Sequence, residues 1–149
     1  MIQEEPKERV RESTTDAANQ SVDNKTLSNI QQFGYAGPDA IKSRLQDLDK
    51  EWDIEKTLEV NAASLALTGV LLGAFVNKKW FVLPGIVSGF LLQHGLQGWC
   101  PPLPIFRKLG IRTTREINEE RTALKTLRGD FAPPLPASPK GLLETVRKN

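Results

Sequence analysis

The sequence has only one cysteine and one histidine, and these scarcities exclude several kinds of site. A single cysteine cannot form an internal disulfide, and one cysteine with one histidine cannot complete a tetrahedral metal site. A phosphate-binding glycine loop and a nucleophile elbow are also missing. We therefore predict that the chain is not an enzyme and that it needs neither a metal nor a cofactor.

An excess of charge of one sign is missing too. The formal net charge is +2 and no basic run is interleaved with aromatic residues, so nucleic acid is not an expected partner. The first 20 residues contain no apolar core, and we therefore expect no secretory signal there. Residues 1–36 hold few large apolar side chains, which predicts a disordered polar N-terminus.

Charge is almost absent from the centre of the chain, where Lys78 and Lys79 are the only full charges between two apolar segments, 61–76 and 81–99. A membrane-spanning helix needs about 20 apolar residues, a length that the second segment reaches and the first approaches. A soluble hairpin of this kind would need a shell of other helices, and the flanks supply only one or two amphipathic ones. We predict an all-α fold in which residues 60–100 form a two-helix transmembrane hairpin.

Residues at the ends of this hairpin are of types that favour a membrane interface. Trp80 and Trp99 bracket the second segment, and Lys78 and Lys79 lie in the short loop. Eight basic residues flank the hairpin closely, against two in its loop: Lys42, Arg44, Lys50, Lys56, Arg107, Lys108, Arg112 and Arg115. Because basic residues favour the cytoplasmic side, we predict a multi-pass protein with both termini in the cytoplasm.

The segments that flank the hairpin have patterns of their own. Residues 101–130 begin with a proline-rich break and continue as a charged cytoplasmic helix, in which Thr113 and Glu116 have capping-box spacing. Residues 131–149 form a proline-rich tail. Residues 37–59 predict an amphipathic juxtamembrane helix that lies on the membrane, pairs with a partner helix or caps the hairpin; its apolar stripe is Ile41, Leu45, Leu48 and Trp52.

Small residues recur at helical spacing in both apolar segments. One set lies on a single face of the first segment and the other lies in the second; they are Ala62, Ala66, Gly69 and Gly73, and Gly85, Ser88 and Gly89. In lipid, small faces let helices approach closely. Two interpretations remain open: both sets close the hairpin, or one closes the hairpin and the other forms a homo-oligomer.

Polar residues gather near the end of the second segment. Gln93, His94 and Gln97 hydrogen-bond across helices in one interpretation, and line a path for a proton, ion or small molecule in another. Cys100 follows them directly. It is an inert small side chain in one interpretation and a reactive thiol in the other, with a pKa lowered by the nearby Arg107 and Lys108.

The residues LALTGVLLGAFV, GIVSGFLLQHGLQGWCPP and RKLGIR, with the element Gly98-Trp99-Cys100-Pro101, resemble the YgaP-like transmembrane domain family. The resemblance covers about residues 54–112. It implies a small bacterial inner-membrane protein built on a glycine-rich two-helix hairpin, which self-associates. Some members accompany a rhodanese, a sulfurtransferase domain that we do not expect in this chain. The resemblance also draws attention to Cys100 as a sulfur-handling thiol.

Three functional hypotheses follow from these patterns. The first is a membrane anchor or scaffold that forms homo-oligomers in the lipid bilayer and holds a cytoplasmic protein partner. The second is a sulfur or redox relay at the membrane that uses Cys100. The third is a component of a small transporter or channel, in which Gln93, His94 and Gln97 line the path.

Overall fold

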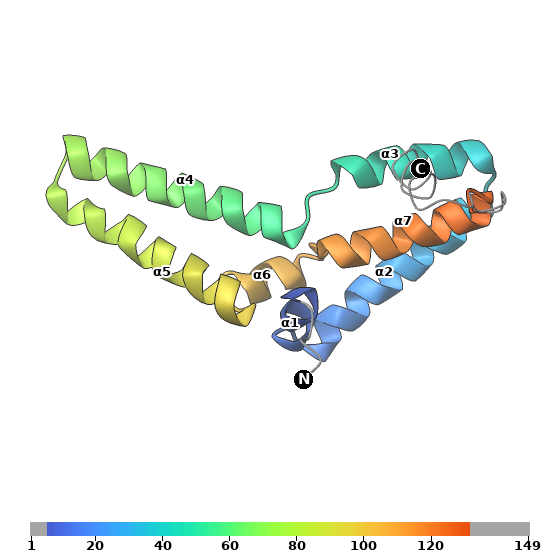
Figure 1. The fold of residues 1–149 in the computed structure, drawn as a ribbon, viewed down its shortest axis with the longest axis horizontal. Helices are drawn as coiled ribbons and strands as arrows, with labels where there is room; N and C mark the ends of the chain where they lie inside the picture. The colour runs from blue at the N-terminus through green and yellow to red at the C-terminus, as the bar shows by residue number, and fades with distance from the viewer. Residues whose placement is uncertain (1–5, 132–149) are drawn as a thin grey trace, which may run out of the picture.

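The computed structural model describes residues 6–131, and all the regular secondary structure in this part of the chain is helical (Figure 1). An all-α fold was predicted, and it is confirmed. The helices are α1 (Pro6–Glu12), α2 (Asp16–Gly34), α3 (Pro38–Lys50), α4 (Ile54–Phe75), the 3-10 helix η1 (Lys78–Phe81), α5 (Val82–Gln97), α6 (Leu103–Lys108) and α7 (Thr114–Arg128).

The helices form two regions. α4 and α5 run antiparallel as an arm, joined at its tip by η1, while α2, α3 and α7 pack side by side as a bundle (Figure 1). The short helices α1 and α6 lie at the junction between arm and bundle (Figure 1). We call these regions the hairpin (α4, η1, α5) and the bundle (α2, α3, α7), and the end of the hairpin that meets the bundle is its base.

Each region has its own small apolar core. In the bundle, the predicted stripe of α3 packs against α7, and the buried residues are Ile41, Leu45, Leu48, Ile117 and Leu124. At the base of the hairpin, α1 and the start of α6 close over the start of α4, and the buried residues are Val10, Ile54, Leu58, Cys100 and Leu103. These two cores hold most of the buried apolar side chains of the described residues.

Several helix ends follow the local signals in the sequence. α3 begins at Pro38, after Gly37 with φ of 106°. α7 begins with the predicted capping box: the Thr113 hydroxyl accepts from the Glu116 N–H, and the Glu116 carboxylate accepts from the Thr113 N–H. α7 ends at Gly129, whose φ of 87° suits glycine.

The prediction that residues 1–36 are disordered is wrong for 6–34, which form α1 and α2. Few apolar side chains are buried here, chiefly Val10, Ala18 and Val22. The segment is ordered because polar side chains on it also find partners in α6 and α7, among them Arg11 and Asn19. Residues 1–5 lie outside the described residues.

Three predicted boundaries also need correction. The helix expected over 37–59 is interrupted, because α3 ends at Lys50 and α4 begins at Ile54, before the predicted hairpin start at residue 60. Asp53 caps α4 by accepting from the Lys56 N–H at 2.7 Å. Trp52 therefore lies between helices and is 50% exposed rather than part of the stripe.

The proline-rich break contains an additional helix, α6. The predicted tail lies outside the described residues from 132 onward.

Candidate functional site

The hairpin exposes apolar side chains along most of its length. No residue of α5 is buried, and the buried residues of α4 are confined to its first turns and to two glycines. Its exposed large apolar side chains include Val60, Leu65, Leu67, Val70, Leu71, Phe75, Val82, Ile86, Phe90, Leu91, Leu92 and Leu96. A soluble monomer rarely presents so large a continuous apolar surface, so this surface is the main candidate for interaction.

The small residues of α4 close the hairpin near its tip. A Cβ atom added at Gly69 would lie 2.5 Å from Pro84 Cδ, and one added at Gly73 would lie 2.9 Å from the Phe81 ring. Both glycines therefore let α5 and η1 approach the α4 backbone. Ala62 and Ala66 are half-buried on the same helix.

The small residues of α5 have different surroundings. No side chain or other backbone comes within 4 Å of a Cβ atom added at Gly85 or Gly89, and Ser88 is exposed. These three residues therefore form a small-residue patch that points away from α4. The two sets that the sequence placed together as packing residues thus separate into an inner and an outer face.

The residues predicted for the membrane interface lie at both ends of the hairpin. Lys78, Lys79 and Trp80 are exposed in η1 at the tip, where Asn77 accepts a hydrogen bond from the Lys79 N–H at 2.9 Å. Trp99 is 38% exposed at the opposite end, just after α5. The two tryptophans therefore mark the two ends of α5.

The polar residues of α5 are paired within the helix and not across it. Gln93 Nε2 donates to Gln97 Oε1, one turn later, at 3.4 Å. His94 is half-buried on the neighbouring position, and its Nδ1 atom is buried without a hydrogen-bond partner among the described residues. Within residues 6–131, the amide bonds between helices that one interpretation expected are not seen.

Cys100 lies in the apolar core at the base, where it is 4% exposed. Burial raises the pKa of its thiol, and a hydrogen bond with the Leu103 backbone only partly opposes this. Arg107, which was expected to lower the pKa, instead binds Glu116 through its guanidinium. This environment is that of an inert buried side chain and gives no support to a sulfur relay.

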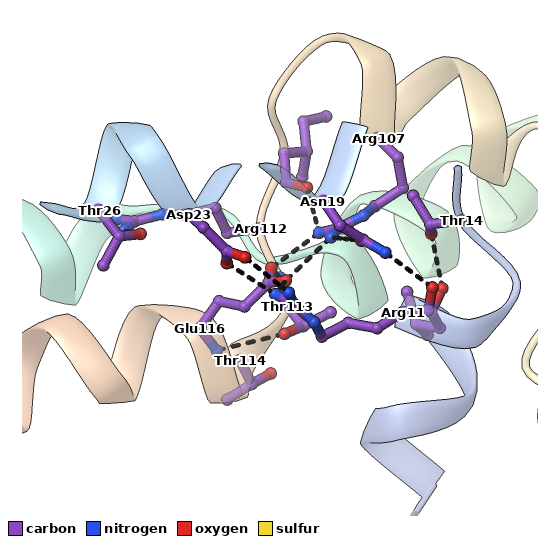
Figure 2. Close-up of polar contacts among 12 residues, drawn as sticks. Arg11, Thr14, Asn19, Asp23, Thr26, Arg107, Arg112, Thr113, Thr114 and Glu116 are labelled. Atoms are coloured by element: carbon purple, nitrogen blue, oxygen red, sulfur yellow. Dashed lines mark hydrogen bonds and ion pairs between the residues drawn. The ribbon is translucent and has the colours of Figure 1, made fainter. Parts of the chain in front are cut away.

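Glu116 of α7 holds two arginines that come from distant parts of the chain (Figure 2). Arg107 of α6 donates to both of its carboxylate oxygens, at 2.7 and 2.9 Å, and Arg11 of α1 donates to one of them at 2.6 Å. Arg107 also donates to Asn19, and Arg11 makes two hydrogen bonds to Asp23. The Arg107 side chain is fully buried, so this cluster fastens α1, α2 and α6 to the start of α7.

A second cluster centres on Glu120, one turn further along α7. Its side chain is fully buried and accepts from Arg112, from Arg44 at 2.7 Å and from Asn29 at 3.2 Å. Arg112, also fully buried, makes two further hydrogen bonds to Glu51, at 2.8 and 2.7 Å. The cluster thus joins α2, α3 and α7.

Both acidic centres are held in the ionised form. Burial by itself would raise the pKa of Glu116, but hydrogen bonds from Arg107 and from the Thr113 N–H outweigh it, and the pKa lies below the ordinary value. The pKa of Glu120 is lowered in the same way, because Arg44 and Arg112 outweigh the effect of burial. Sequence reasoning missed both clusters and counted Arg44, Arg107 and Arg112 among the basic residues that favour the cytoplasmic side.

The base of the hairpin is attached to the bundle by direct hydrogen bonds. The Ile54 N–H at the start of α4 donates to the Arg112 carbonyl at 2.8 Å. The Thr114 hydroxyl, at the start of α7, donates to Asp53 at 2.9 Å. The first turn of α4 is therefore fixed to the first turn of α7.

Helix α1 is attached to the other helix of the hairpin, α5. Arg9 Nη1 donates to the Leu96 carbonyl at 2.7 Å, which satisfies one of the last carbonyls of α5. Gly98 ends α5 with φ of 72°, and a Cβ atom added there would lie 2.6 Å from Arg9 Cβ. The contact therefore depends on glycine both for its conformation and for its size.

Among the described residues, one helical stretch is long and apolar enough to cross a membrane. It is Pro38–Phe75, which includes α4, and 17% of its most apolar part is buried in the structure. Helix α5, with 16 residues, is shorter than such a span. In the same part of the chain, no three His, Cys, Asp or Glu side chains gather as metal ligands would.

Comparisons with known proteins give one relative. The chain is 43% identical over 56 residues to an uncharacterized protein of Synechocystis sp. (strain PCC 6803), and the match covers 38% of this chain and 31% of that protein. The chain therefore spans less than two thirds of that relative's length. No protein-family model and no solved structure matches the chain. The resemblance to the YgaP-like family stays a prediction.

Proposed function

We propose that this chain is a membrane anchor or scaffold of the bacterial inner membrane. In this proposal the hairpin crosses the bilayer twice, and the bundle forms a cytoplasmic platform for a protein partner. The observation that carries the proposal is the contrast between the regions. The hairpin leaves its large apolar side chains exposed, whereas the bundle buries Glu116 and Glu120 in ion pairs with Arg107 and Arg112.

The dimensions of the hairpin support a bilayer in preference to a soluble partner. The 16 residues of α5 extend about 24 Å, somewhat less than the hydrocarbon core of about 30 Å. Trp80 and Trp99, at the two ends of α5, have the amphipathic rings that favour the two interfaces. Lys78 and Lys79 at the tip can extend to the headgroups and make up the small shortfall.

The outer patch of Gly85, Ser88 and Gly89 supports self-association. The inner glycines already close the hairpin, so the outer patch has no packing role within the described residues. In lipid, helices associate through close packing at such small-residue faces. A hairpin of two helices has little interior of its own, and association of copies through α5 would give it one.

Membrane insertion is tested by placing arginine on both helices of the hairpin. Leu67 and Leu92 are 60% and 65% exposed, and an arginine near the centre of a span costs about 2.5–3.5 kcal/mol. We expect wild-type protein to stay in the membrane pellet after an alkaline carbonate wash, and Leu67→Arg/Leu92→Arg protein to be lost from it. The matched control is Leu27→Arg on α2, where the wild-type leucine is 58% exposed, and it should stay in the pellet.

The orientation of the hairpin in the membrane is tested in the same cells by placing a single cysteine at its tip. In a Cys100→Ser background, Lys78→Cys should react with an impermeant maleimide added outside, because η1 is exposed and faces the periplasm in this proposal. Extraction of the wild-type chain by carbonate would contradict insertion. Labelling of the tip only in inside-out vesicles would reverse the orientation.

Self-association is tested by enlarging the outer patch. We expect wild-type protein in mild detergent to have at least twice the monomer mass of 16.6 kDa by light scattering, after subtraction of the detergent. Gly85→Leu/Gly89→Leu protein should move to the monomer mass, because the leucines hold a second helix away. Ala63→Leu, at an exposed position of α4, is the control and should leave the mass unchanged. A monomeric wild type would contradict this part of the proposal.

A further inference from the structure

The hairpin contains a cavity on the base side of its glycine contacts. α4 and α5 lie close together near the tip, where Gly69 and Gly73 admit their neighbours, and they separate toward the base (Figure 1). Between them lies a cavity of about 140 Å³. Its walls are residues three, four and seven apart on each helix, from Leu58 to Leu65 on α4 and from Val87 to His94 on α5.

The lining of this cavity is apolar with a small polar part. Cys100 lies at the base end, and the polar groups in the walls are His94 and Asn61. Asn61 is exposed, whereas the Nδ1 atom of His94 is buried and has no hydrogen-bond partner among the described residues. Buried polar atoms in proteins are nearly always paired. His94 lines this cavity, so a ligand bound there can supply the partner that its Nδ1 atom lacks.

We propose that this cavity binds a small molecule made of a single aromatic ring with one oxygen-bearing substituent. The cavity is partly open, and its volume is close to that of the apolar cavities of about 150 Å³ that accept one benzene-sized ring. The oxygen substituent would pair with His94 Nδ1. A lipid acyl chain is the less suitable occupant, since it fills apolar space but has no group for this nitrogen. The proposal goes beyond anchoring, because it assigns a ligand site inside the hairpin.

The experiment measures binding of two matched fluorinated rings to the full-length chain in mild detergent by ¹⁹F NMR. The probes are 4-fluorophenol, whose hydroxyl can both donate and accept, and 4-fluorotoluene, which has the same shape without the hydroxyl. We expect saturable binding of both, with 4-fluorophenol bound more tightly. Ala62→Phe should abolish it, because Ala62 lines the cavity. Ala63→Phe, one position away and exposed, should bind like wild type.

A second variant tests the role of the nitrogen separately from the space. His94→Phe keeps a ring in the wall and removes Nδ1, so 4-fluorophenol should bind about three- to tenfold more weakly, as for loss of one hydrogen bond. Binding of 4-fluorotoluene should change little. If Ala62→Phe fails to fold, Val87→Phe fills the cavity from α5.

Three results would overturn the proposal. The first is that wild-type protein binds neither probe in a saturable way, as expected if a detergent or lipid tail fills the cavity. The second is that Ala62→Phe and Val87→Phe both bind like Ala63→Phe. The third is that His94→Phe leaves the preference for 4-fluorophenol intact. None of these outcomes depends on whether the hairpin anchors the chain in a membrane.

Discussion

Replacing Glu120 by alanine is expected to destabilise the bundle by about 3–5 kcal/mol, because the change removes a buried carboxylate that binds Arg112, Arg44 and Asn29. The side chains of Glu120 and Arg112 are both fully buried in the native fold. Arg44 also loses a partner in this variant. Hydrogen–deuterium exchange of the full-length chain gives the measurement. Amides of α7 should exchange about a hundredfold faster or more.

The control for this variant lies one position away. Glu119 is 57% exposed and pairs with Arg115 on the surface, so Glu119→Ala should cost about 0–1 kcal/mol. The double variant Arg112→Leu/Glu120→Leu removes both buried charges and should be much closer to wild type than Glu120→Ala. Equal exchange in Glu120→Ala and Glu119→Ala would contradict the role assigned to the cluster.

The same cluster predicts how stability depends on pH. The pKa of Glu120 is lowered in the folded chain, so its contribution is present above the unfolded value and is lost as the pH falls through the folded one. The ordinary pKa of a glutamate side chain is 4.5. The difference in exchange between wild type and Glu120→Ala should therefore be constant near neutral pH and should narrow as the pH is lowered below that value.

Replacing Gly98 by leucine is expected to release α1 from the hairpin. The left-handed conformation at this position costs a side chain about 1–2 kcal/mol. The added Cβ would also lie 2.6 Å from Arg9 Cβ and 3.1 Å from the Arg9 backbone carbon. We expect tryptic cleavage after Arg9 and Arg11 to be about tenfold faster or more, since about 1.4 kcal/mol is a factor of ten.

Gly95 supplies the matched control for Gly98. It has no atom within 4 Å of an added Cβ and no positive φ, so Gly95→Leu should be cleaved at the wild-type rate. The leucine is more apolar than glycine in both variants, and any general effect of the side chain on detergent binding is therefore common to them. Cleavage of Gly98→Leu at the wild-type rate would show that α1 does not need this contact.

The parts of the fold that the sequence predicted are those with strong local signals. The predicted capping box of Thr113 and Glu116 fixes the start of α7. This signal acts within one turn of backbone, so no knowledge of the tertiary fold was needed. The apolar stripe of α3 was also readable, apart from Trp52, which lies beyond the helix end.

Helices α1 and α2 could not be predicted from their composition. The argument for disorder assumes that order requires a large apolar face, and α2 buries little beyond Ala18 and Val22. Its order depends on pairings such as Arg107 with Asn19 and Arg112 with Thr26, which join residues 88 and 86 positions apart. Pairings at such separations leave no periodic signal in the sequence.

The sequence predicted the small residues of the hairpin, but not that they divide into an inner and an outer face. Spacing alone placed Gly69 and Gly85 in equivalent small-residue sets, and only their surroundings separate an inner contact from an outer patch. The cavity was equally hidden, because it depends on the local separation of two helices rather than on any residue type. One interpretation placed the hydrogen bonds of Gln93 and Gln97 across helices, whereas the bond between them lies within α5.

The hydrogen bonds between Ile54 and Arg112, and between Asp53 and Thr114, fasten the base of the hairpin to the bundle. We therefore expect the two regions to turn together as one body. Under the proposed insertion, the helices of the hairpin would change their tilt to match a bilayer thinner or thicker than the hairpin. The bundle would then turn through the same angle, so that bilayer thickness would set the direction in which its polar faces are presented to the proposed partner.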